Sequence, residues 1–244
     1  MTTEREIADR LAIATSTLYS PEDVVRPPLA LGMVRDALER GYDVVVADHG
    51  SPDTFLKELG RTGATVIATT GTMGSQRRQA MQKASELESI VAWLEPEKQS
   101  YIPELWKTGV PILEGNADIV VPSRPTLSGY PLVQKGVEYA GNALWKALTG
   151  TDLDVWFGPR TFNADRTHYF TQYDGRHGDR WEGIFVPLVE AIADGNRVLD
   201  VPVEYAHPTQ QTLQESLDPR FIAKRLSQLY IISRAVDAAV REST

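Results

Sequence analysis

Two acidic residues one position apart stand directly after an apolar run near the middle of the chain. Glu95 and Glu97 follow residues 89–94 (SIVAWL) and are separated by Pro96. In an extended segment, side chains at i and i+2 project to the same side. Two carboxylates placed in this way can hold Mg²⁺ or Mn²⁺. The same residues are also ordinary for a solvated turn after a strand, so the spacing alone leaves both interpretations open.

Two further loops carry groups suited to binding a nucleotide. Asp48 follows the apolar run 43–47 and could accept hydrogen bonds from a base or ribose, or it could close an Asx turn. The glycine-rich loop 71–78 precedes a predicted helix and contains Gly74, Arg77 and Arg78. A helix N-terminus with arginines is a natural phosphate site. Its spacing matches neither common phosphate-binding fingerprint, so a turn with solvated arginines is the alternative.

Two other arginines and one histidine complete the candidate binding residues. Arg124 and Arg160 each follow a predicted strand or loop on the expected ligand side and could neutralise phosphate, although an ion pair is the commoner role of an arginine. His207 lies just past a predicted strand. It is the best candidate for a third metal ligand beside Glu95 and Glu97.

A general base is the remaining requirement of group transfer to a hydroxyl. Asp179 and Glu182 are the acidic residues available near the start of a predicted helix, and Glu182 is the preferred base. A phosphate acceptor would need no strong base. The alternative is that both acids stabilise a helix N-terminus through its dipole.

The elements that must position these residues alternate regularly in the first part of the chain. Apolar strands and amphipathic helices follow one another, which predicts a mostly parallel sheet with helices on both faces. In such sheets ligands bind beyond the carboxyl ends of the strands, where loops 48–53, 71–78 and 95–99 would lie. The predicted strands are 11–15, 43–47, 64–69 and 89–94, and the predicted helices are 29–40, 54–60 and 76–87.

The second part of the chain is less regular. It shows no internal repeat, low-complexity tract or linker, so we expect residues 1–244 to form one domain. We expect strands at 117–123 and 197–205, a loop or short strand at 152–160, and helices at 102–114, 133–148, 181–193 and 221–241.

Composition narrows the class of protein. The net charge is −8 and no run of Lys or Arg stands out, so nucleic acid is not an expected partner. The chain has no cysteine, which excludes disulfides and thiol catalysis. No apolar run approaches the roughly 20 residues of a membrane helix, and the first ten residues are charged. We therefore expect a cytoplasmic protein.

Several segments together resemble one enzyme family. Residues 48–54 are similar to Asp-Asp-Gly-Ser-Pro-Asp-Gly-Thr, and residues 92–97 stand where an Asp-x-Asp follows a strand. Residues 114–124, 154–162 and 195–205 are similar to Glu-Gly-x-Asp-Ile-Val-x-Gly-Ser-Arg, Asp-x-x-x-Gly-Phe-Arg-x-Phe and a Gly-x-x-x-x-Glu-Val-Pro-Val-x-Tyr strand. In this order and spacing they resemble the family 2 glycosyltransferases of the GT-A fold, and most of all the dolichol- or polyprenyl-phosphate mannose synthase branch.

The resemblance implies a GT-A fold and transfer of a hexose from a nucleoside diphosphate sugar to a polyprenyl phosphate or a small soluble acceptor. It implies a nucleotide-sugar half at about 1–123 and an acceptor half at about 124–244. Asp48 would hold the nucleoside, and Glu95 and Glu97 would hold Mg²⁺ or Mn²⁺ on the diphosphate. Peripheral membrane contact and a homodimer stay open.

The chain departs from the family's pattern at two places. The second Asp of the first motif is His49, and the Asp-x-Asp is replaced by Glu95-Pro96-Glu97. The alternative function is therefore a degenerate GT-A domain that binds a nucleotide sugar or a partner protein without transfer. A sugar-1-phosphate nucleotidyltransferase is disfavoured, because residues 15–19 after the first strand lack glycine.

Overall fold

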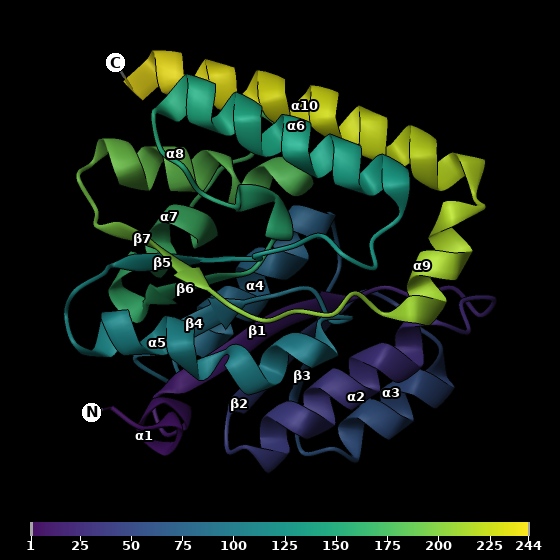
Figure 1. Cartoon of the computed structure of the whole chain (residues 1–244). Coiled ribbons are helices and arrows are strands. Elements are labelled where there is room, and N and C mark those ends of the chain that lie inside the picture. The colour runs from purple at the N-terminus through teal and green to yellow at the C-terminus, as the bar shows by residue number, and fades with distance from the viewer. Residues whose placement is uncertain (1, 244) are drawn as a thin grey trace.

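The fold is built on one seven-stranded sheet with the order β3-β2-β1-β4-β6-β5-β7 (Figure 1). It is seen in a computed structural model that describes residues 2–243. Strand β6 is antiparallel to both of its neighbours, and every other pairing is parallel. The strands are β1 (Leu11–Thr17), β2 (Asp43–Asp48), β3 (Thr65–Ala68), β4 (Ile90–Trp93), β5 (Ile119–Ser123), β6 (Arg160–Asn163) and β7 (Val198–Pro202).

Helices cover both faces of this sheet, as the sequence predicts (Figure 1). One face carries α4 (Met73–Ser85), α6 (Leu132–Thr149), α7 (Thr167–Thr171), α8 (Val186–Ala193) and α10 (Pro219–Ser243). The other carries α1 (Glu4–Ala8), α2 (Arg26–Glu39), α3 (Asp53–Gly60) and α5 (Trp106–Leu113). The remaining elements are α9 (Thr209–Ser216) and the short 3₁₀ turns η1 (Gln99–Glu104), η2 (Val155–Phe157), η3 (Ala164–Arg166) and η4 (Trp181–Ile184).

The central strands are apolar throughout because both of their faces are buried. In β1, Ala12 and Ala14 pack into the core under α4, whereas Leu11 and Ile13 pack into the core over α2. Successive side chains of a strand point to opposite faces, and a strand covered on both faces therefore reads as a continuous apolar run. This is why the sequence located these strands.

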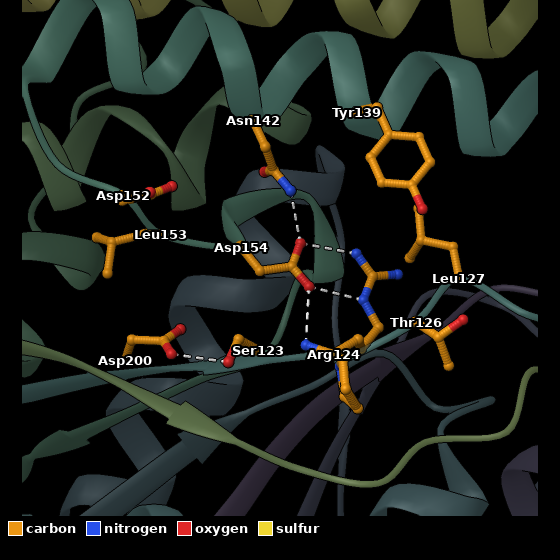
Figure 2. A pocket seen from close by; sticks show the side chains of 11 residues that line it. Ser123, Arg124, Thr126, Leu127, Tyr139, Asn142, Asp152, Leu153, Asp154 and Asp200 are labelled. Carbon is orange, nitrogen blue, oxygen red and sulfur yellow. Dashed lines mark hydrogen bonds and ion pairs between the residues drawn. The ribbon is translucent and has the colours of Figure 1, made fainter.

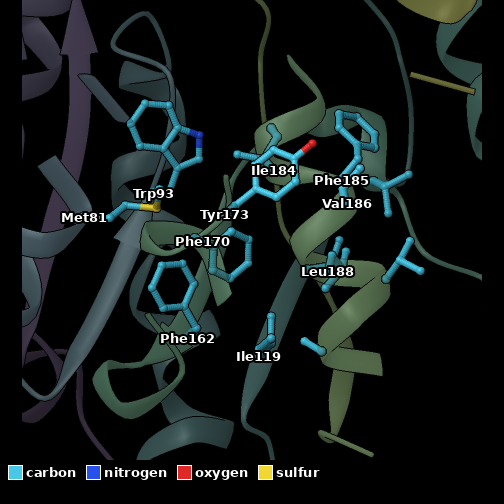
Figure 3. Close-up of a cluster of buried hydrophobic side chains, with 14 of the residues drawn as sticks. Met81, Trp93, Ile119, Phe162, Phe170, Tyr173, Ile184, Phe185, Val186 and Leu188 are labelled. Atoms are coloured by element: carbon cyan, nitrogen blue, oxygen red, sulfur yellow. The ribbon is translucent and has the colours of Figure 1, made fainter. Parts of the chain in front are cut away.

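An aromatic cluster holds the second part of the chain against the sheet (Figure 3). Phe162 of β6 stacks on Phe170 of α7, with ring centroids 4.7 Å apart. Trp93 at the end of β4 lies in the same cluster, as do Tyr173 and Phe185. The cluster fixes the segment between β6 and α8, which forms one wall behind the carboxyl end of β4.

Several expected elements were wrong in detail. The expected helices 102–114 and 181–193 are each a 3₁₀ turn followed by a shorter helix, whereas the segment 152–160 is the expected loop, with η2 inside it and strand β6 at its end. Pro187 lies in the first turn of α8, where a missing N–H costs nothing, so the helix begins there. Helices α1, α7 and α9 were not expected. These are short helices of five to eight residues, whose apolar pattern is too brief to detect.

No helix within residues 2–243 is long and apolar enough to cross a membrane.

Two glycines of α6 test how closely this helix packs. A Cβ at Gly141 would overlap the indole nitrogen of Trp156, whereas a Cβ at Gly136 would meet nothing within 4 Å. Gly141→Ala should therefore lower the free energy of unfolding by about 1–3 kcal/mol through overpacking. Gly136→Ala, the matched control, should raise it by about 0.5–1 kcal/mol through helix propensity. Urea unfolding checks both, and equal effects of the two variants would contradict this packing.

Candidate functional site

A cavity of about 400 Å³ lies at the carboxyl ends of β1 and β4. The ends of β1 and β2 contribute Ser16, Thr17 and His49 to its wall, and the loop after β4 contributes residues 95–98. Helices from the second part of the chain close it from the opposite side, with side chains that include Gln134, Glu138, Gln211, Glu215, Lys224, Arg225 and Gln228. The loops that the sequence places at this edge of the sheet thus meet the C-terminal helices across one cavity.

The two glutamates after β4 do not act as a pair. Glu95 lies against Gly158, whose backbone it approaches so closely that a Cβ there would overlap the carboxylate. Glu97 instead accepts a hydrogen bond of 3.3 Å from the hydroxyl of Tyr19. Burial raises the pKa of Glu97, and the nearby Arg26 opposes the shift. Each carboxylate therefore has its own contact partner, although the charge of Glu95 adds to the rise in the pKa of Glu97.

Lys98 lies next to Glu95, which the sequence predicted as a metal ligand. The Nζ atom of Lys98 lies 3.8 Å from Oε2 of Glu95. It also lies 4.6 Å from the ring centroid of Phe157 and 5.0 Å from that of Tyr205. Both distances are in the range of cation–π attraction. Lys98 thus brings a positive charge to the carboxylate that the sequence predicted as a metal ligand.

His207 does not join the two glutamates as a third ligand. Its Nδ1 atom is 2.7 Å from the hydroxyl of Thr212, and its ring packs on Tyr130 with centroids 4.2 Å apart. Burial, reinforced by Lys98 and Arg225, lowers the pKa of His207 to about 3. The imidazole is therefore neutral.

The predicted metal site does not fit these residues. Within residues 2–243, no group of three or more His, Asp or Glu side chains is arranged to hold a metal ion. Mg²⁺ and Mn²⁺ need several oxygen ligands that converge on one point. Here no third acid or histidine among residues 2–243 joins Glu95 and Glu97, and Lys98 lies near the first, so we assign no step to a metal ion.

Asp48 shapes the first loop from the inside. Its Oδ1 atom accepts hydrogen bonds of 2.9 Å from the N–H groups of Gly50 and Ser51, and Oδ2 accepts one of 2.7 Å from the hydroxyl of Thr17. The side chain is buried. This is the Asx turn that the sequence offered as the alternative. The adjacent His49, rather than Asp48, lines the cavity.

The anionic group at the N-terminus of α4 is a side chain of the protein itself, the carboxylate of Asp179. The carboxylate of Asp179 accepts hydrogen bonds from Thr72 and Arg78, and its main-chain oxygen accepts one of 3.1 Å from the N–H of Gly74. A Cβ at Gly74 would overlap Asp179, which explains the glycine. The hydrogen bonds from Arg78 and Thr72 overcome the effect of burial and lower the pKa of Asp179. Asp179 therefore connects its own segment to the N-terminus of α4.

Arg77 lies on the wall of the cavity, close to three acidic side chains. It is buried, and its nearest charges are Glu95, Glu182 and Asp179. Its Nη1 donates to the main-chain oxygen of Arg180 at 2.5 Å. Glu182 is also buried and accepts a hydrogen bond of 3.1 Å from the N–H of Arg180. Neither Glu182 nor Asp179 is among the residues that line the cavity, whereas Arg77 is.

Arg124 is held in a buried ion-pair network (Figure 2). Its Nε and Nη2 atoms donate to the two oxygens of Asp154, each at 2.8 Å, and its Nη1 lies 2.6 Å from Oε2 of Glu138. Asn142 donates to the same Asp154 at 2.7 Å. These partners raise the pKa of Arg124 against the effect of burial. With its donors occupied, Arg124 is not available for the phosphate contact that the sequence suggested.

Arg160, the first residue of β6, is likewise bound by other groups of the protein. It is fully buried and donates to the main-chain oxygens of Pro159 and Val155 at 2.7 and 2.8 Å. Burial lowers its pKa to about 10, which still leaves the group charged at neutral pH. It supports the η2 turn and does not line the cavity.

Four cationic side chains of the cavity were missed by the sequence analysis. Lys98 belongs to the loop that was singled out, but attention fell on its acids. Arg26 begins α2, and Lys224 and Arg225 lie on α10. Nothing local distinguishes a lysine and an arginine on an amphipathic helix from ordinary solvated charges. Only the packing of α10 over the sheet reveals them.

The sheet order and the cavity at its carboxyl edge define the class of fold, an α/β nucleotide-diphospho-sugar transferase fold of the GT-A type. Solved structures of glucosyl-3-phosphoglycerate synthase from Mycobacterium tuberculosis share it. The structure with phosphoglyceric acid and the structure with Mg²⁺ and uridine diphosphate both have a TM-score of 0.68 and 14% identity, and the similarity covers 99% and 100% of this chain and 84% of theirs.

A third structure of that synthase contains Mn²⁺, uridine diphosphate glucose and phosphoglyceric acid. It has a TM-score of 0.66 and 14% identity, with 99% of this chain and 84% of that chain covered. No protein-family model matches the chain, and no curated protein sequence matches it. The similarity therefore shows the fold, and nothing supports the narrower resemblance to the mannose synthase branch.

The Arg124 network should be a large contributor to stability. Arg124→Met leaves Glu138 and Asp154 buried without their cation, and we expect a loss of about 3–5 kcal/mol in the free energy of unfolding. Arg197→Met removes an arginine that is 56% exposed and pairs with Asp118, and should cost about 1 kcal/mol or less. Denaturant unfolding compares the two, and a similar small loss in both would show that the buried network is dispensable.

Proposed function

We propose that the chain is a nucleotide-sugar-dependent hexosyltransferase. It would move a hexose from a nucleoside diphosphate sugar to a polyprenyl phosphate or a small soluble acceptor. The observation that carries the proposal is the cavity at the carboxyl ends of β1 and β4, which joins the first three loops to basic residues of α10. The GT-A fold supports it, because ligands of open α/β sheets bind at this edge.

The reaction in the proposal breaks the bond between C1 of the hexose and the diphosphate, and the electron pair remains on the leaving phosphate oxygen. An acceptor oxygen forms the new bond to C1. A phosphate acceptor carries no proton at that oxygen, whereas a hydroxyl acceptor releases one that the leaving diphosphate can take up. No protein base is therefore needed, and Asp179 and Glu182 act in the proposal as positioning residues behind Arg77.

In the proposal, residues on the cavity wall bind the nucleoside of the donor. His49 stands between the ends of β1 and β3, and its Nδ1 is 2.8 Å from the main-chain oxygen of Thr69. It presents a flat ring next to Ser16 and Thr17, which is a suitable surface for a ribose or base. Asp48 keeps this loop closed from the inside.

A degenerate domain that binds without transfer is the second candidate. The observation that favours it is the engagement of the acidic residues by the chain itself, in particular Asp179 by Arg78. This domain would bind a nucleotide sugar or a partner protein; as a binder of a nucleotide sugar it would share the donor site of the first candidate and differ only in turnover.

A ligand panel tests the proposal. The purified chain is heated with sugar nucleotides of uridine, guanosine and thymidine, beginning with uridine diphosphate glucose, the donor of the similar synthase structure. One donor at about a hundred times its dissociation constant should stabilise the fold by about 2.7 kcal/mol. The same donor is then assayed for hexose transfer to 3-phosphoglycerate, glycerol phosphate and polyprenyl phosphate.

Histidine variants supply the control. His49→Ala should weaken donor binding about tenfold, equivalent to about 1.4 kcal/mol. His168→Ala, which changes an exposed histidine outside the cavity, should leave donor affinity unchanged. Binding without transfer or hydrolysis would favour the degenerate domain, and the absence of any donor binding would overturn both candidates.

A further inference from the structure

Several positive charges of the cavity have no full ionic partner. No carboxylate among residues 2–243 lies within 4 Å of the charged nitrogens of Lys224 or Arg225, and for Lys98 the single such contact is the 3.8 Å approach of Glu95. Arg124, by contrast, is bound by the carboxylates of both Asp154 and Glu138. The cavity therefore contains cations that the protein itself has not neutralised.

Lys98 is the most deeply placed of them. Its side chain is 12% exposed and lies between the rings of Phe157 and Tyr205. No hydrogen bond from its Nζ atom to another of the described residues is present, although an ammonium group has three donors. Since the group lines the cavity, these donors face the space that a ligand would fill.

Arg225 approaches the same space from α10. Its Nη1 donates to Gln228 at 3.1 Å, and its guanidinium lies 4.9 Å from the ring centroid of Phe221. Its Nε atom is buried and has no hydrogen-bond partner. An unpaired buried donor carries a desolvation cost that a bound acceptor would remove.

The acids of the cavity offset these charges only in part: Glu95 and Glu138 favour the charged form of Lys98, and Glu215 and Glu97 favour that of Lys224. Glu138 pairs with Arg124, and Glu215 lies 3.2 Å from Arg26. Glu97 accepts from Tyr19, and Glu95 is the distant neighbour of Lys98. Burial lowers the pKa of Lys98, Glu95 opposes this shift, and the positive charges of Arg124 and Arg225 add to it. Two like charges that face one partly dry cavity are stabilised when an anion enters between them.

We propose that Lys98 and Arg225, with Arg26 and Lys224 at the rim, form a cationic clamp that holds the diphosphate of the donor without a divalent ion. This inference rests on the proposed function and names the groups that would replace the metal. Arginine offers a fork of donors to phosphate oxygens, and lysine offers a compact point charge. The clamp lies directly beyond β4, where Glu95 and Glu97 fail to converge on a metal.

The clamp also explains the place of α9 and α10. Arg26 of α2 pairs with Glu215 of α9, and α9 leads into α10, which carries Lys224 and Arg225. The basic side chains of the C-terminal helix are thus tied to the sheet half of the cavity. A diphosphate would bridge the loop after β4 and α10, and would neutralise the charge that grows on the leaving group.

Calorimetric titration of the full chain tests this proposal. Uridine, guanosine and thymidine diphosphates, uridine monophosphate, pyrophosphate and inorganic phosphate are titrated in EDTA and again in MnCl₂. The nucleoside diphosphate that binds should do so in EDTA, with an affinity within about threefold of that in Mn²⁺. Lys98→Met and Arg225→Met should each weaken it at least about tenfold, as expected for a lost charged hydrogen bond. Lys98→Arg, which keeps the charge, should retain most of the affinity.

Matched variants guard against general effects of charge. Lys83→Met changes a lysine of α4 that pairs with Glu86, and Arg220→Met changes an arginine of α10 that is 93% exposed. Neither lines the cavity, and neither should alter affinity. Circular dichroism confirms that each variant is folded. If Lys98→Met does not fold, Arg225→Met on the covering helix carries the test alone.

The outcomes separate the clamp from the proposed function. Binding of a nucleoside diphosphate only with Mn²⁺ would overturn the clamp and leave the transferase. Pyrophosphate that binds in EDTA and is lost in Lys98→Met, with no binding of any nucleotide, would support the clamp and overturn the transferase. Monophosphates that bind as tightly as diphosphates would overturn the assignment to the donor and point to an acceptor phosphate. Wild-type affinity in Lys98→Met and Arg225→Met would overturn the clamp.

Discussion

A guanidinium group that leaves water must find its hydrogen-bond partners inside the protein, and this chain meets that requirement fully at Arg124 and in part at Arg77 and Arg160, whose Nε atoms have no partner. Each of these arginines joins segments that are distant in the sequence. Arg77 of α4 donates to the main chain at Arg180, and Arg124 after β5 is bound by Asp154 and Glu138. The irregular second part of the chain is thus attached to the regular sheet by buried charges. Such groups contribute most through what their loss would leave unpaired.

The need of buried cations for partners also bears on which cations are available to a ligand. The arginines with many protein partners form the wall and hold the η2 turn and the 179–182 segment in place. The cations with few partners, Lys98 and Arg225 above all, face the cavity. Proteins keep buried charges paired unless the charge serves binding or catalysis. The lack of a close carboxylate, together with a place on the cavity wall, is therefore what singles out Lys98 and Arg225 for the proposed clamp.

The sequence predicted the parts of this structure whose signals are local. Strands β1 and β2 are buried on both faces, and their apolar runs end at turn residues, so their position and the parallel sheet could be read directly. The edge of the sheet where the cavity lies also followed from that topology. The close packing of Gly74 on Asp179 and of Gly141 on Trp156 could not be read, because it depends on contacts between remote segments.

Side-chain roles were predictable only as alternatives. For Asp48 the structure has the turn, with its carboxylate consumed by Gly50, Ser51 and Thr17. For the helix N-terminus at α4, the prediction of an anion site was chemically sound, but no local signal told that Asp179, more than a hundred residues later, would fill it. A motif states what a residue can bind. Only the fold decides whether a ligand or another part of the chain reaches it first.

The segment Glu95-Pro96-Glu97-Lys98 shows how a changed motif can keep a binding edge while its chemistry changes. A carboxylate pair serves a diphosphate only through a cation, because like charges repel. Here Glu95 contacts Gly158 and Glu97 contacts Tyr19, and no third acid or histidine of the described residues joins them to hold a metal ion. In the proposed clamp the lysine in the next position would supply the positive charge directly, with Glu95 and the rings of Phe157 and Tyr205 around its ammonium group. The proposal thus treats Glu95 as a partner of Lys98, and Lys98 as the group that would meet the phosphate.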